Sequence, residues 1–269
     1  MKSRIWSAVL ILLFITACSG TFEIGLEHTP PNPTSVMPSV TPILTLPSSA
    51  PTLIPPSPTF QIVATTVPTP TNIVLALGTT AAVEQGTIQP GQVMTYTLSA
   101  QQSQPLILLL YSPNNDVTLG VFEPNGAKLL DPANQWTRWE YLLPRTEMYT
   151  IQVIGGAMTE NYTLTAKVAQ VVNFAAGTTA ITLTGSTING YVFSYGLYCL
   201  AGQTMTASLN VSSNTAYIDI FGLASGTILG AAAKASTWTG VLQETQEVVI
   251  EVVPNNGQVL NYSLQVSIH

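Results

Sequence analysis

The chain contains an internal duplication at a constant spacing of 99 residues, and this repeat limits the folds that it can adopt. Gly78-Thr79-Thr80 recurs as Gly177-Thr178-Thr179, and Trp139 recurs as Trp238. Further pairs at this spacing are Tyr96 and Tyr195, Gln104 and Gln203, Phe122 and Phe221, Leu143 and Leu242, Thr146 and Thr245, and Ile151 and Ile250. Aligned glycine and aromatic positions indicate two copies of one structural unit. Each copy has about 95 residues, which is enough for a core of its own.

Both copies show the alternation of polar and apolar residues that marks half-buried β-strands. The alternating segments are residues 93–98, 149–153 and 162–166 in the first copy, and residues 248–252 and 262–268 in the second. Pairs such as Asn125-Gly126 separate them and supply the positive φ angles of tight turns. We therefore predict an all-β chain with two tandem β-sandwiches, over residues 73–169 and 173–269.

Residues 18–72 are interpreted as a linker. Within it, residues 29–71 hold 12 of the 19 prolines and 15 serine or threonine residues, and they contain no charged side chain. Proline lacks an amide donor and restricts the residue before it, so segments such as Pro55-Pro56-Ser57-Pro58 exclude helices and central strands. The sequence predicts a disordered Pro/Thr-rich stalk, which is either glycosylated or bare.

Residues 1–17 have the layout of a lipoprotein signal peptide. Lys2 and Arg4 give a positive start, an apolar run follows, and the stretch Ile15-Thr16-Ala17-Cys18 has the pattern of a bacterial lipobox. This order predicts cleavage before Cys18 and lipid on its thiol, whereas a plain secretory signal is the alternative. Two or more acyl chains hold a protein stably on a membrane. We therefore expect an extracytoplasmic protein that is anchored by lipid at the cell surface or envelope.

Charged side chains make up only 7% of the chain, and the formal net charge is −6. Removal of residues 1–17 would take away two of the seven basic residues and no acidic one. An acidic chain of this kind does not attract nucleic acid or the surface of an anionic membrane. Nucleic acid is therefore excluded as an expected partner, and contact with the membrane is expected only through the lipid.

Residues suited to catalysis or metal binding are sparse. The two histidines, His28 and His269, lie in the linker and at the last position, so we expect neither to be held in a catalytic arrangement. The acidic residues are scattered, which argues against a glycosidase pair and against a metal site. Cys199 aligns with Ala100, which predicts a buried and unreactive thiol. We expect a protein that is not an enzyme and that binds no cofactor or metal.

Trp136 is the candidate for a ligand-binding residue. Its counterpart in the second copy is Ala235, whereas Trp139 is duplicated. On a strand, Trp136, Arg138 and Glu140 would share one face, opposite Trp139. An exposed tryptophan beside a charged pair can stack on a sugar or anchor a partner protein. The alternative is a loop tryptophan that folds over its own domain.

Each copy also resembles the bacterial pre-peptidase C-terminal domain. The matching segments of the second copy are Ala201-Gly202-Gln203-Thr204-Met205, Tyr217-Ile218-Asp219-Ile220-Phe221, Trp238-Thr239-Gly240-Val241-Leu242 and Asn261-Tyr262-Ser263-Leu264. Those of the first copy are Asn115-Asp116-Val117, Leu142-Leu143-Pro144, Tyr149-Thr150-Ile151 and Asn161-Tyr162-Thr163-Leu164. The first copy has Ser103 where the family has glycine, and the second has Gln243 where it has proline. The resemblance implies a jelly-roll β-sandwich on an exported protein. A weaker similarity links the copies to bacterial inhibitors of goose-type lysozyme.

Together these features predict a non-catalytic surface lipoprotein that displays two β-sandwich binding modules. The expected ligands are envelope glycan, extracellular polymer or an exported protein, with Trp136, Arg138 and Glu140 as the binding residues. Two alternatives stay open. One is an inhibitor of a lysozyme-type cell-wall hydrolase, and the other is a structural subunit of an envelope complex.

Overall fold

The computed structural model describes residues 69–188, 190–211, 215–255, 257 and 259–269. The predicted signal peptide, Cys18 and the predicted linker up to residue 68 lie outside these described residues. The described part consists of β-strands and connecting turns, together with two single 3-10 turns, η1 (Pro132–Asn134) and η2 (Ala231–Ala233). The all-β prediction is confirmed.

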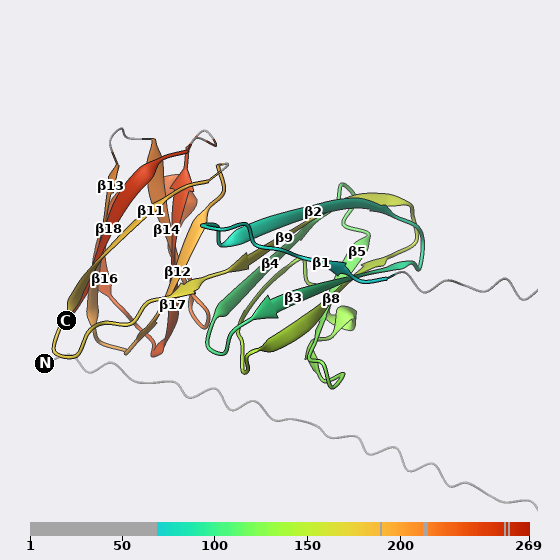
Figure 1. Cartoon of the computed structure of the whole chain (residues 1–269), viewed down its shortest axis with the longest axis horizontal. Helices are drawn as coiled ribbons and strands as arrows, with labels where there is room; N and C mark the ends of the chain where they lie inside the picture. The colour runs from blue at the N-terminus through green and yellow to red at the C-terminus, as the bar shows by residue number, and fades with distance from the viewer. Residues whose placement is uncertain (1–68, 189, 212–214, 256, 258) are drawn as a thin grey trace, which may run out of the picture. The chain divides into compact units, whose positions relative to one another are not determined.

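The first copy folds into two sheets, with the strand orders β1-β3-β8-β5-β6 and β2-β9-β4-β7 (Figure 1). Its strands are β1 (Thr71–Asn72), β2 (Ala81–Ile88), β3 (Val93–Ala100), β4 (Pro105–Tyr111), β5 (Val117–Phe122), β6 (Lys128–Leu130), β7 (Arg138–Leu142), β8 (Glu147–Gly155) and β9 (Glu160–Val168). From β2 to β9 the chain visits the two sheets in the order of a jelly roll. A short parallel strand, β1, is added at the edge beside β3.

The second copy repeats this arrangement, with the strand orders β10-β12-β17-β14-β15 and β11-β18-β13-β16. Its strands are β10 (Gln170–Val171), β11 (Ala180–Ser186), β12 (Phe193–Cys199), β13 (Thr204–Val211), β14 (Ala216–Gly222), β15 (Gly226–Leu229), β16 (Thr237–Val241), β17 (Gln246–Pro254) and β18 (Asn261–Ile268). Strands β1 and β10 take in residues that the sequence analysis placed in the linker and between the two domains. Each pairs in parallel with a strand of the sandwich that follows it.

Duplicated residues make the same bonds in both copies. The hydroxyls of Tyr96 and Tyr162 lie 2.5 Å apart in the first core, and those of Tyr195 and Tyr262 lie 2.9 Å apart in the second. The side-chain oxygen of Gln104 accepts a bond from a backbone amide of its own turn, and its duplicate Gln203 does the same. The aligned positions are therefore those that fix the core and the turns.

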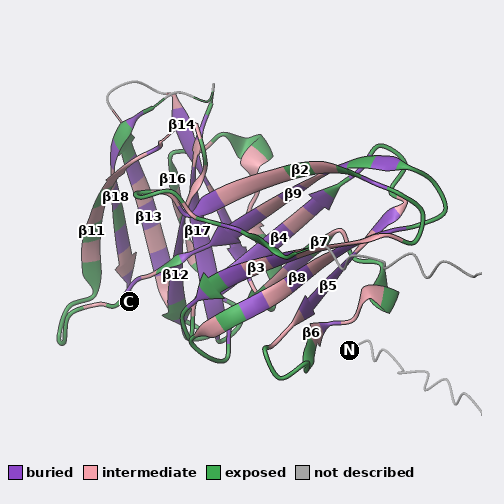
Figure 2. Cartoon of the chain, turned by 45° about the vertical axis from the view of Figure 1, so that its right-hand side comes forward, coloured by how far each residue is buried: buried purple, intermediate pink, exposed green. Residues whose placement is uncertain are grey.

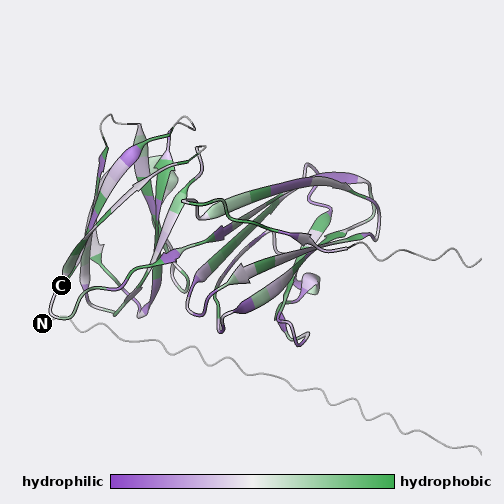
Figure 3. Ribbon diagram, viewed as in Figure 1, coloured by the Kyte–Doolittle hydropathy of each residue, from purple (hydrophilic) through white to green (hydrophobic). Residues whose placement is uncertain are grey.

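Each sandwich has its own hydrophobic core, built from the residues that alternate inward along its strands (Figures 2 and 3). Strand β8 follows the predicted alternation, since Tyr149, Ile151 and Val153 are buried and the residues between them are partly exposed. Its counterpart β17 does not. From residue 246 to residue 252 every side chain of β17 is buried. The prediction of a half-buried strand at residues 248–252 is wrong, because a second layer covers the outward face of β17.

Candidate functional site

The covering layer is the first sandwich, and both copies belong to one compact unit. A separate buried cluster contains Ile107 of β4 and Ala169 from the first copy, and Phe221 of β14 and Val249 of β17 from the second. Ile107 and Val249 point away from the cores of their own sandwiches, because their strand neighbours fill those cores. The outward face of β4 therefore packs on the outward faces of β14 and β17, and we call this contact the joint.

An ion pair is buried in the joint. Lys167 Nζ of β9 lies 2.8 Å from Oε1 and 2.9 Å from Oε2 of Glu251 on β17. The hydroxyl of Ser194 donates to the same carboxylate at 3.2 Å, and the backbone amide of Ser194 donates to the hydroxyl of Thr80 at 2.8 Å. A buried carboxylate is tolerated only when charge and hydrogen bonds compensate it, and this one has both.

Two further acids of the second copy are affected by burial. Burial raises the pKa of Glu247 to about 7. The pKa of Asp219 is also raised, first by burial and then by the charge of Glu251, while Lys167 and Arg138 act in the opposite direction. With a pKa of about 7, Glu247 is partly protonated at neutral pH, which lowers the charge that is buried there.

A hollow of about 420 Å³ opens beside the joint. The first copy lines it with Trp136, Arg138 and Glu140, and the second copy lines it with Asp219 and Phe221, among others. The three residues predicted from the sequence are therefore brought together at one concave surface. Asp219 and Phe221 were not predicted as members of this site; in the sequence they stand out only within the segment 217–221 that resembles the pre-peptidase C-terminal domain.

The charged pair in this hollow is held in place from two sides. Arg138 and Glu140 of β7 form an ion pair with each other. The guanidinium carbon of Arg138 also lies 5.3 Å from the centroid of the Phe221 ring, which is within the range of a cation–π contact. Trp139, between them on the strand, faces the core of the first copy and is buried. The predicted alternation about Trp139 is thus observed.

Trp136 lies just before β7 and is 52% exposed. Trp139 instead stacks on Tyr141, with ring centroids 5.2 Å apart. Trp136 belongs to neither hydrophobic core. Its position leaves a large apolar ring at the edge of a hollow that also contains the Arg138–Glu140 ion pair and Asp219. Such a ring can take a flat apolar surface of a ligand, and the polar groups around it can orient that ligand.

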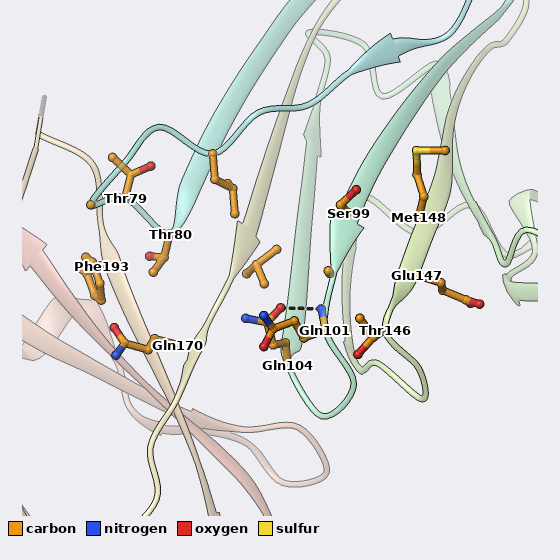
Figure 4. A pocket seen from close by; sticks show the side chains of 14 residues that line it. Thr79, Thr80, Ser99, Gln101, Gln104, Thr146, Glu147, Met148, Gln170 and Phe193 are labelled. Carbon is orange, nitrogen blue, oxygen red and sulfur yellow. Dashed lines mark hydrogen bonds between the residues drawn. The ribbon is translucent and has the colours of Figure 1, made fainter.

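A larger hollow of about 740 Å³ lies elsewhere between the copies (Figure 4). Two of its polar side chains, Gln104 and Thr146, are engaged in the fold, whereas Oε1 of Glu147 is buried without a hydrogen-bond partner among the described residues. The amide oxygen of Gln104 accepts from Gln101 N at 2.7 Å, as the dashed line shows, and the hydroxyl of Thr146 accepts from Gln102 N at 2.9 Å. The same two bonds recur in the second copy, where Gln203 and Thr245 accept them. These groups hold turns, so the hollow at Trp136 is the better candidate site.

Cys199 is buried, as its alignment with Ala100 predicts. Among the described residues, no three of His, Cys, Asp and Glu are grouped so that they could hold a metal ion. No helix in this part of the chain has the length and apolar character required to cross a membrane.

No family model matches the chain, and no curated protein matches it. The resemblance to pre-peptidase C-terminal domains therefore stays a prediction. Among solved structures, the chain is similar to PliG of Aeromonas hydrophila, a periplasmic inhibitor of g-type lysozyme, at 26% identity and a TM-score of 0.34, over 38% of this chain and 96% of that one. PliG of Salmonella Typhimurium follows at 18% identity and a TM-score of 0.31, over 38% and 99% of the two chains.

The exported protein XepA of PBSX is similar over a larger share of this chain, 70%, and over 86% of its own, at 9% identity and a TM-score of 0.24. Likenesses of this extent carry no argument about function. The function is therefore argued from the residues of this chain.

Proposed function

We propose that the chain is a non-catalytic binding protein, and that its ligand contacts Trp136 in the hollow beside the joint. The observation that supports this proposal is the exposure of Trp136 at a concave surface that both copies build. Burial of an aromatic ring of this size contributes favourable free energy, and the fold itself leaves the ring of Trp136 about half exposed. A ligand that covers the ring would supply that gain.

The surroundings of Trp136 favour a glycan over a charged partner. Arg138 and Glu140 compensate each other, and Phe221 lies against the guanidinium. A sugar ring offers an apolar face for stacking and hydroxyl groups for the flanking charged pair. We therefore place an envelope glycan or an extracellular polysaccharide first among the ligands.

The test is retention on immobilised polysaccharide prepared from bacterial envelopes. Trp136→Ala is expected to lower the affinity at least tenfold, because truncation of an anchoring aromatic residue costs about 2 kcal/mol or more. Tyr198→Ala is the matched control, since Tyr198 is an exposed aromatic residue of β12 that does not line this hollow. Equal loss in both variants, or loss in neither, would overturn the assignment of the site.

Inhibition of goose-type lysozyme is measured in parallel with the same proteins. If the protein inhibits the lysozyme stoichiometrically and is not retained on glycan, the partner is a hydrolase and not a glycan. Inhibition that is lost in Trp136→Ala and kept in Tyr198→Ala would place that partner on the same hollow.

We also propose that lipid on Cys18 holds this site at a membrane surface, which rests on the lipobox and on the proline-rich linker that follows it. Cys18→Ala is expected to release the folded protein into the medium of growing cells. Unchanged membrane retention of that variant would refute the lipid assignment. Glycan binding by the released protein would separate the role of the anchor from that of the site.

A further inference from the structure

The outward face of the sheet β2-β9-β4-β7 extends beyond the joint. On this face, outward residues of neighbouring strands lie opposite each other in rows that cross the sheet. Ile107 and Leu109 lie in two such rows, and both residues belong to the buried cluster at the joint. The next row consists of Gln85, Thr163 and Tyr111 on β2, β9 and β4. One step further, Thr87 lies opposite Asn161.

These outward residues line a hollow of about 400 Å³, which is distinct from the one at Trp136. Tyr111 is 65% exposed and supplies an aromatic ring. The residues that line this hollow are all uncharged. Their side chains therefore offer one ring, hydroxyls and amides, and no fixed charge.

One amide in this hollow is oriented in advance. The hydroxyl of Thr87 donates to Oδ1 of Asn161 at 2.7 Å. This bond fixes the carboxamide of Asn161, so that its NH₂ group is left to donate to another acceptor. A fixed donor beside an exposed ring is the combination that recognises a hydroxyl-bearing ring by stacking and by a directed hydrogen bond.

The two exposed aromatic residues occupy neighbouring positions. Leu109 of β4 lies opposite Arg138 of β7, and Leu110 N donates to Thr137 O at 2.7 Å beyond the end of β7. Tyr111 directly follows Leu110 and Trp136 directly precedes Thr137, so both residues adjoin this bond. In the second copy the equivalent positions hold Asn210 and Ala235, so both aromatic residues are particular to the first copy.

We propose that Tyr111, Asn161 and their uncharged neighbours form a second saccharide subsite, and that the ligand is an extended, uncharged glycan that contacts both Tyr111 and Trp136. This inference rests on the proposed function and deepens it, because it names the class of ligand. The uncharged lining at Tyr111 is complementary to a neutral polymer, and at Trp136 the cation Arg138 is already paired with Glu140. Binding should therefore depend little on salt.

The test uses calorimetric titration of the full chain with β-1,4-linked oligomers of glucose and of N-acetylglucosamine, each with two and with six sugar units. Tyr111→Ala is expected to weaken binding of the hexamer about tenfold, because one of the two aromatic contacts is removed. Trp136→Ala is expected to weaken binding of both lengths. Asn210→Ala, at the equivalent position of the second copy, is the control and should change neither.

The outcomes separate the two proposals. Loss of hexamer binding in Trp136→Ala, with Tyr111→Ala unchanged, would overturn the second subsite and leave the proposed function intact. Failure of every neutral oligomer, together with retention of the protein on envelope polysaccharide, would overturn the neutral class of ligand alone. Unfolding temperatures close to that of the unaltered chain are expected for Tyr111→Ala, since its side chain is mostly exposed. Tyr111→Phe keeps the ring and should keep hexamer affinity.

Discussion

Lys167 of β9 and Glu251 of β17 form a buried ion pair that ties the first sandwich to the second. The lysine nitrogen lies within 2.9 Å of both carboxylate oxygens, and the two side chains are only 10% and 5% exposed. The duplication does not repeat this contact, because Lys167 aligns with Ser267 and Glu251 aligns with Gln152. The pair therefore distinguishes the surfaces that meet at the joint from the equivalent surfaces of the other copy.

Removal of the cation from this pair should be strongly destabilising. Lys167→Met leaves Glu251 buried without its partner, and we expect the free energy of unfolding in urea to fall by about 3–5 kcal/mol. The double variant Lys167→Met with Glu251→Met removes both charges and should recover most of that loss. Lys128→Met, which breaks the exposed pair with Asp131, should cost far less, because solvent screens that pair. A loss as small for Lys167→Met would show that the pair contributes little to the joint.

The face of the second copy that corresponds to the covered face of the first is polar. Ile107, Leu109 and Lys167 on the covered face of the first copy correspond to Thr206, Ser208 and Ser267 on the second. The latter three point outward from the sheet β11-β18-β13-β16, where Thr206 and Thr239 share a hydrogen bond of 3.0 Å. Hydroxyl groups can face water without a covering layer, whereas the apolar face of the first copy cannot. This face of the second copy therefore needs no covering layer.

The alternation of polar and apolar residues and the duplication were sufficient to predict the two sandwiches, because both patterns can be recognised in the sequence without knowing which surfaces pack together. The joint was not predicted, since packing of one outward face on another leaves only an indirect signal. That signal was present in residues 248–252, where valine and isoleucine occupy both faces of the strand and Glu251 interrupts them. A nearly continuous apolar run indicates a strand that is covered on both sides. Trp136 was singled out because its counterpart is alanine. Tyr111 has the same signal in its counterpart Asn210, but its place beside Trp136 follows only from the strand register.

Glu247 should make the stability of the chain dependent on pH. Burial raises its pKa from the ordinary value of 4.5 to about 7, so between these values the folded state binds more protons than the unfolded state. The free energy of unfolding should therefore fall as pH rises from about 4.5 through about 7, by on the order of 3 kcal/mol. Glu247→Gln should flatten this part of the profile. The exposed Glu244→Gln is the control, and an equal effect of both variants would contradict the assignment.

Ser103 offers a test of the turn that the two copies share. Its φ angle is 63°, while Gly202 at the duplicate position has a φ angle of 85°. The left-handed conformation costs a residue with a side chain about 1–2 kcal/mol, and part of that cost is offset by the greater freedom of glycine in the unfolded chain. We expect Ser103→Gly to raise the unfolding temperature by a few degrees, corresponding to about 1 kcal/mol. Gly202→Ser should lower the unfolding temperature. A lower unfolding temperature for Ser103→Gly would show that contacts of the Ser103 side chain stabilise the turn.

Cys199 should be chemically silent in the folded protein. Burial, aided by the charge of Glu247, raises the pKa of its thiol to about 12, and the side chain is fully covered. The thiolate is the reactive form, so at pH 8 both its population and its access to reagent are low. Iodoacetamide should leave the peptide that contains Cys199 unmodified, as measured by mass spectrometry, and should label it fully in urea. Labelling at equal rates in both conditions would show that the C-terminal end of β12 opens in the native state. Cys199 would then not be a permanently buried core residue.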